Sequence, residues 1–141
     1  MLPLKDLARR NEEYAARQLG LSRQTLLECQ SRLDQLSSFR MEYIQQMQQA
    51  GNAGINGQQL QTFQQFISQL DFAINQQKQR IAVAEMNCHN QTRQWQEKHQ
   101  KTEALNKAID RMQFQERRNQ LRKEQREQDE FRSKSRLPDF S

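Results

Sequence analysis

A heptad repeat of apolar residues between Leu60 and Met112 constrains the fold of this chain more than any other feature. The repeat positions alternate in gaps of three and four, and the segment contains no glycine or proline. This spacing lines the residues up along one side of a long helix, where a partner helix must cover them. The sequence therefore predicts a rod of long helices. The repeat positions are Leu60, Phe63, Ile67, Leu70, Ile74, Gln77, Ile81, Ala84, Cys88, Gln91, Trp95, Lys98, Thr102, Leu105, Ile109 and Met112, and only Gln77, Gln91, Lys98 and Thr102 interrupt its apolar character.

The composition favours a thin core. Only 34% of the 141 residues are hydrophobic, and the mean hydropathy is −1.14. A helical hairpin accommodates this composition because each helix buries only a narrow stripe. Low hydropathy is also typical of disordered chains, but a net charge of +5 is modest for this length, and the sustained repeat indicates folding, at least with a partner.

The excess of basic residues would suit nucleic acid, an anionic membrane surface or an acidic protein partner. No stretch approaches the roughly 18 apolar residues of a membrane span, and the first residues lack the apolar core of a secretory signal. We therefore expect a cytoplasmic protein without direct membrane insertion.

A glycine cluster marks the turn of the predicted hairpin. Gly51, Gly54 and Gly57 fall in one short segment, and Asn56 is suited to cap a following helix. We predict an all-α fold: one coiled-coil rod over residues 1–141, with helix 3–49, turn 50–57, a longer antiparallel helix 58–132 and a frayed basic tail 133–141. Folding about residue 54 would place Cys29 opposite residues 78–79, about 15 Å from Cys88, too far for a disulfide.

The two ends of the rod should differ. The repeat of the first helix is clear from Leu26 to Met47, whereas Leu4, Leu7, Ala8, Ala15 and Leu19 drift in phase, which predicts looser packing there. The second helix is longer, so residues beyond Ile109 should project as a single helix that frays without a partner.

Catalytic and metal-binding patterns are missing from the sequence. His89 and His99 lie ten residues apart, about 15 Å along a helix, and cannot share a metal ion. We expect His99 on a solvated face beside Lys98 and Lys101. No phosphate-binding glycine loop, CxxC pair or nucleophile elbow is present, so we predict no enzyme activity, catalytic residue, cofactor or metal.

An apolar stripe runs beside the repeat near the turn, contributed by both predicted helices. The hairpin register places Tyr43 near Gln64 and Leu36 near Asp71, so the two halves should merge into one patch. A two-helix rod cannot enclose Phe39 and Phe66, which favours a protein-binding surface. The alternative is that these residues belong to a wide core, where we also expect Trp95. The stripe comprises Arg32, Leu36, Phe39 and Tyr43 with Phe66, Leu70, Ala73 and Gln77.

Three segments give the chain a family resemblance. They are Leu4-Lys5-Asp6-Leu7-Ala8, Glu42-Tyr43, and Phe63-Gln64-Gln65-Phe66-Ile67-Ser68-Gln69-Leu70 followed by Ala73-Ile74. Together they resemble the FliJ family of the flagellar protein export apparatus. The resemblance implies an antiparallel coiled coil similar to the central stalk of rotary ATPases. It also implies three partners: the hexameric export ATPase, the cytoplasmic domain of the membrane export gate, and export chaperones.

The resemblance also assigns residues to partners. It implies an export-gate surface at Leu36, Phe39, Tyr43, Phe66, Leu70 and Ala73, where Arg32 and Gln77 replace an expected glutamine and histidine. It implies an ATPase-binding end containing Leu4, Asp6 and Leu7 with the basic helix at Arg117, Arg118 and Arg122. The protein would then associate peripherally with the cytoplasmic face of the inner membrane through the export apparatus.

Three other functions remain open from the sequence. The first is the equivalent stalk of a virulence type III secretion system, and the second is a general cytosolic chaperone or scaffold that holds a helix in a groove. The third is DNA binding by the tail after Gln113, which the interspersed acids and the missing parallel dimer repeat disfavour. We therefore expect no nucleic-acid partner.

Overall fold

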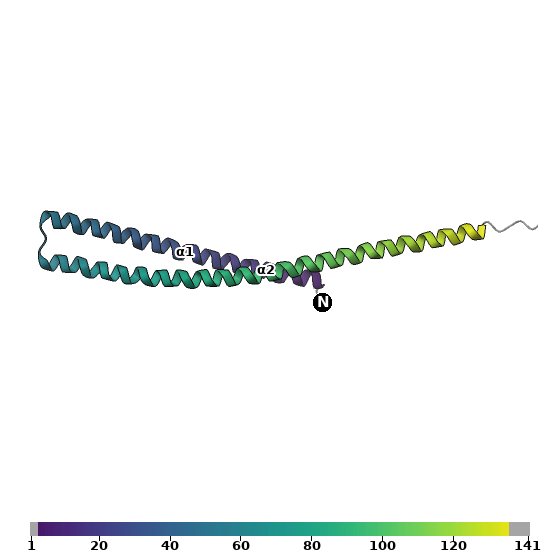
Figure 1. Ribbon diagram of the computed structural model, residues 1–141, viewed down its shortest axis with the longest axis horizontal. Helices are drawn as coiled ribbons and strands as arrows, with labels where there is room; N and C mark the ends of the chain where they lie inside the picture. Colours follow the sequence, from purple (N-terminus) through teal and green to yellow (C-terminus); the bar gives the residue numbers. More distant parts are fainter. Residues whose placement is uncertain (1–2, 136–141) are drawn as a thin grey trace, which may run out of the picture.

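The chain forms two long helices that fold back on each other (Figure 1). The computed structural model describes residues 3–135, with α1 over Leu4–Ala53 and α2 over Gly57–Ser135. At 1.5 Å per residue, α1 is about 75 Å long and α2 about 120 Å. The helices pack against each other in antiparallel orientation, which confirms the predicted all-α hairpin.

The turn is shorter than the glycine cluster suggested. Helix α1 continues through Gly51 to Ala53, so only residues 54–56 lie between the helices instead of 50–57. Gly54 has a φ of +87°, a left-handed conformation that glycine adopts without a Cβ clash. Asn56 caps α2 as expected: its Oδ1 accepts a 2.8 Å hydrogen bond from the Gln59 amide, and Gln59 Oε1 accepts one of 3.3 Å from the Asn56 amide.

The heptad positions of α2 form the contact with α1. Every position from Phe63 to Ile109 is buried or half-buried, and Leu60 and Met112 at the two ends are exposed. Leu70 and Ala84 are the buried apolar residues of α2. The predicted partner-covered stripe is thus the interface of the hairpin.

Our prediction of loose packing along the first half of α1 was wrong. Ala15 and Leu19 are the most buried residues of this helix, each with 6% of its surface exposed. The α1 repeat is continuous here once two polar residues are counted as members. Its positions, which follow the gaps of three and four, are Ala8, Glu12, Ala15, Leu19, Ser22 and Leu26. Leu4 and Leu7 lie outside this line and are exposed.

Polar contacts fix how the helices are aligned. Arg40 Nε lies 2.5 Å from Asp71 Oδ1, and the Thr102 hydroxyl donates to the Ala8 carbonyl oxygen at 3.3 Å. Both contacts agree with folding about residue 54. Cys29 and Cys88 are free thiols.

Helix α2 outruns α1 and projects as a single helix (Figure 1). Every residue from 110 to 135 is exposed, as predicted for the part beyond Ile109. The helix continues to Ser135, past the predicted end at residue 132. The rest of the predicted basic tail, residues 136–141, lies outside the described residues. Neither helix has a stretch that is both long and apolar enough to cross a membrane, as far as the described residues go.

Candidate functional site

The predicted gate surface is brought together by both helices near the turn. We call Leu36, Phe39, Tyr43, Phe66, Leu70 and Ala73 the aromatic patch. Phe39 meets Phe66 edge to face, with ring centroids 6.0 Å apart, and Tyr43 packs on Phe66 at 4.4 Å. Tyr43 also contacts Phe63 at 5.1 Å. The structure therefore merges the two halves of the stripe.

Exposure divides the patch into supporting and accessible residues. Leu70 is buried, and Leu36, Tyr43, Phe66 and Ala73 are half-buried. Phe39 keeps 48% of its surface exposed although its ring lies against Phe66. Phe39 and Phe66 directly precede interface positions in their helices, so they lie on one flank of the seam, where no third helix covers them. The patch is an edge of the core that solvent can reach.

Gln77 lies at the end of this stripe but does not belong to the exposed surface. Only 3% of it is exposed, and its Nε2 donates a 2.9 Å hydrogen bond to the Cys29 carbonyl oxygen. The side chain is therefore engaged within the hairpin. Arg32, by contrast, is exposed.

The residues predicted to bind the ATPase lie at one end of the rod but not in one cluster. Leu4 and Leu7 are 73% and 46% exposed, and Asp6 is half-buried. Because Ala8 lies beside Thr102, Arg117 lies about 22 Å farther along α2. We call this end, where α1 starts beside α2, the fork.

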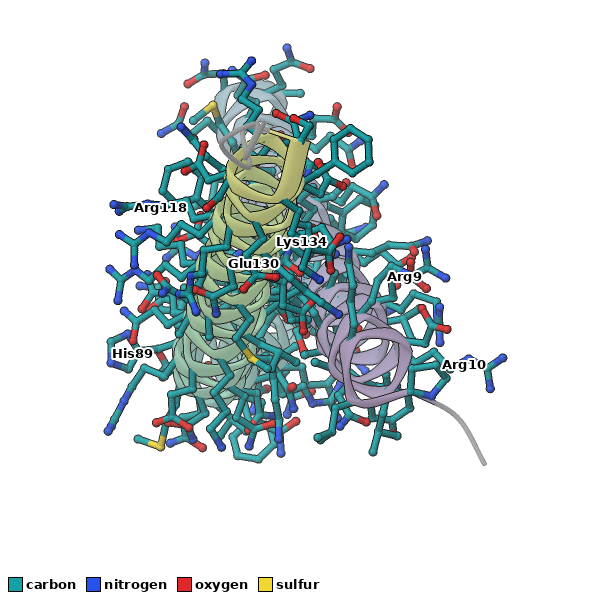
Figure 2. The ribbon with its side chains drawn as sticks, turned by 90° about the vertical axis from the view of Figure 1, so that its right-hand side faces the viewer. Arg9, Arg10, His89, Arg118, Glu130 and Lys134 are labelled. Carbon is teal, nitrogen blue, oxygen red and sulfur yellow. The ribbon has the colours of Figure 1, made fainter. Side chains whose placement is uncertain are left out.

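Basic side chains project from both helices at this end of the rod. Arg117, Arg118 and Arg122 are exposed on the projecting helix. Viewed along the rod from this end, Arg118 points away from α1, while Arg10 points outward from the far side of α1 (Figure 2). Arg118 also lies over the Phe114 ring, 5.9 Å from its centroid. The fork therefore offers charge and apolar surface over a length of helix.

His99 is partly solvated, with 40% of its side chain exposed, but it also contacts the other helix, which we did not expect. Its Nδ1 lies 2.6 Å from Glu12 of α1, its Nε2 lies 3.1 Å from Glu103, and its ring stacks on Trp95 at 5.1 Å. The hydrogen bond to Glu12 raises the pKa of His99, while the same bond lowers the pKa of Glu12. The sequence hid this contact because Glu12 is a polar member of the α1 repeat. Trp95 is half-buried at its interface position.

No group of three or more histidine, cysteine, aspartate or glutamate residues that could hold a metal ion occurs within residues 3–135. The candidate sites are instead exposed surfaces on a stiff rod. The fold and these sites define a coiled-coil hairpin protein.

The comparisons identify the family. Residues 1–135 match the family model described as Flagellar FliJ protein. Two relatives carry that same description. The one from Escherichia coli K12 is 33% identical over 72% of this chain and 69% of the relative, and the one from Salmonella typhi is 29% identical over 91% and 87%. The chain belongs to the FliJ family, a non-catalytic component of the flagellar protein export apparatus.

A solved structure from Chlamydia trachomatis, described as a candidate YscO homolog, covers 92% of this chain and is itself covered to 84%, with 19% identity. Its TM-score is 0.44, so the likeness is loose.

Proposed function

We propose that this protein is the central stalk of the export ATPase and connects it to the export gate. The observation that carries the proposal is the separation of two exposed surfaces on one rod: the aromatic patch near the turn and the fork at the opposite end. A rod of this shape can contact two partners at once. Family membership supports a place for it in the export apparatus.

The fork binds the export ATPase hexamer. A single projecting helix can enter the centre of a ring, and its arginines, together with Leu4, Asp6 and Leu7, supply the contacts. If the rod binds the assembled hexamer more tightly than its subunits, it raises ATPase activity by stabilising the hexamer. No catalytic group on the rod is needed.

The aromatic patch binds the cytoplasmic domain of the export gate. Phe39 is a large apolar side chain with about half of its surface free, and its ring lies against Phe66, which itself packs on Tyr43. Such supported aromatic residues are typical anchors of protein interfaces. Through these two contacts the rod holds the ATPase at the cytoplasmic face of the inner membrane and assists export chaperone cycling there.

Titration of the purified rod into the purified export ATPase tests the stalk function. We expect ATP turnover and the hexamer fraction to rise together, and a variant with Arg117, Arg118 and Arg122 replaced by glutamate to lose most of the effect. The matched control reverses the charge of Arg23, Lys78 and Arg93, which are exposed on the hairpin itself, away from the fork. Unchanged turnover and oligomer size with the unmodified rod would contradict the stalk function.

Binding to the purified cytoplasmic domain of the export gate tests the second surface. We expect the double variant Phe39→Ala/Phe66→Ala to bind at least tenfold more weakly while keeping its helix content. Met41→Ala/Phe72→Ala is the matched control, because both residues are 64% exposed and lie outside the patch. Equal binding by both variants would refute the assignment of the patch.

A further inference from the structure

A groove containing two arginines continues the aromatic patch toward the fork. Both helices line it, with Arg32 from α1 and Arg80 from α2, and it has a volume of about 560 Å³. Arg32 lies one heptad before Phe39, and Arg80 lies two heptads after Phe66. The two arginines and the two phenylalanines therefore occupy the same flank of the hairpin.

The positive charge in this groove is not neutralised within the hairpin. Neither Arg32 nor Arg80 takes part in an ion pair among residues 3–135. Glu28 also lines the groove, but its carboxylate accepts a 3.4 Å hydrogen bond from Gln24 and forms no ion pair there. Two guanidinium groups thus face a single carboxylate.

The other polar groups of the groove add to its capacity to hold an anion. The Ser31 hydroxyl and the Gln35 side-chain amide line it and can donate hydrogen bonds. Gln77 lines its floor, but the amide nitrogen of Gln77 is already bound to the Cys29 carbonyl oxygen. Free donors and cations therefore predominate on the open side.

We infer that this groove binds a carboxylate side chain of the protein that docks on the aromatic patch. The inference rests on the proposed gate-binding function of the patch. Guanidinium groups bind carboxylates through paired, charge-assisted hydrogen bonds. Phe39 supplies the apolar anchor, and the arginines, about 10 Å away along the rod, set the orientation and register of the partner.

Affinity measurements with the purified cytoplasmic domain of the export gate test this inference on the full-length rod. The test variant is Arg32→Glu/Arg80→Glu. The matched control is Arg23→Glu/Lys78→Glu, because these exposed cations lie on the opposite flank, which also carries Asp71. We expect the test variant to bind at least tenfold more weakly and the control to change less than threefold. Raising the salt concentration should weaken gate binding by the unmodified rod more than gate binding by an Arg32→Gln/Arg80→Gln variant.

Four outcomes can be told apart. Loss of binding in the test variant alone supports the groove as a carboxylate site. Equal losses in test and control variants indicate general charge attraction and overturn the inference. Full binding by the test variant, with loss in Phe39→Ala/Phe66→Ala, overturns the inference but leaves the gate-binding function intact. Full binding by both of these variants refutes the assignment of gate binding to the aromatic patch, and the carboxylate site with it.

Discussion

The side-chain nitrogen of Gln77 donates a 2.9 Å hydrogen bond to the main-chain carbonyl oxygen of Cys29 and so joins the two helices near the middle of the hairpin. Gln77 occupies a position of the α2 repeat that is otherwise mostly apolar, and it is more buried than any of its apolar neighbours in the seam. A buried polar group with one available partner penalises every other alignment of the helices. We interpret this bond, together with the Arg40–Asp71 and Thr102–Ala8 contacts, as what fixes the register.

Replacing Gln77 with leucine should change the helix register without lowering the stability of the hairpin. We expect Gln77→Leu to keep the free energy of unfolding or to raise it by up to about 1 kcal/mol, because a buried polar group is exchanged for an apolar one. We also expect additional oligomers, since the preferred alignment is lost. Urea unfolding and light scattering after gel filtration measure the two effects. The exposed neighbour variant Gln76→Leu is the control, and a single species with Gln77→Leu would show that other contacts set the register.

The ion pair between His99 and Glu12 should make the fork sensitive to pH. Because the pKa of His99 is raised in the folded protein, the contribution of His99 to folding stability is complete below about pH 6.5. It is lost as the pH rises through the raised pKa. Because the pKa of Glu12 is lowered in the folded protein, the contribution of Glu12 to folding stability is complete above about pH 4.3. It is lost as the pH falls through the lowered pKa. Stability from this pair is therefore greatest between these two pH values.

Hydrogen exchange of the first turns of α1 at pH 5.5 and pH 8.5 measures this effect, after correction for the intrinsic exchange rates. We expect less protection at the higher pH in the unmodified rod, and no such difference in His99→Gln or Glu12→Gln. A pH difference that persists in both variants would assign the sensitivity to other groups.

Two glycines should respond to alanine in opposite directions. Gly54→Ala should lower the free energy of unfolding by about 1–2 kcal/mol, because φ is +87° in the turn and alanine is strained there. Gly20→Ala should raise it by about 0.5–1 kcal/mol, because Gly20 is inside α1 and a new Cβ would meet nothing within 4 Å. Thermal and urea unfolding compare the two variants directly, and destabilisation by Gly20→Ala would contradict the open space around that residue.

Within the aromatic patch, Tyr43 should matter for folding and Phe39 mainly for binding. Tyr43 contacts both Phe63 and Phe66, so Tyr43→Ala should cost about 2 kcal/mol of unfolding free energy. Phe39 makes one edge contact and is half exposed, so Phe39→Ala should cost less than about 1 kcal/mol. Urea unfolding measures both values, and equal costs would place Phe39 in the core.

The projecting part of α2 should exchange its amide hydrogens rapidly. Residues 113–135 are all exposed, so this part of α2 lacks the tertiary packing that supplies most of the stability of helices in proteins. We expect deuterium uptake there to be at least a hundredfold faster than around Leu70 or Ala84. Addition of the export ATPase should slow deuterium uptake in this segment. If uptake in the free rod were already as slow there as in the hairpin, the expected low stability of the projecting helix would be contradicted.

The sequence by itself determined the helices, the turn, the alignment and the unequal lengths, because these depend on apolar periodicity, glycine conformation and chain counting. The repeat from Phe63 to Ile109 became the interface of α2, and Asn56 became its cap. The aromatic patch could also be found, since Phe39 and Phe66 stand beside repeat positions at matching distances from the turn.

Only the tertiary structure decided the polar part of the interface. Glu12 and Ser22 continue the α1 repeat, but a search for apolar periodicity reads them as breaks, so the tight packing at Ala15 and Leu19 was missed. Glu12 can occupy an interface position because His99 of the opposite helix pairs with its carboxylate. The groove likewise depends on Arg32 and Arg80 lining one hollow from different helices. The spacing of apolar residues can be recognised within one helix. The hydrogen-bond and ion-pair partners of polar residues lie on the other helix, and a single sequence does not show which residues pair.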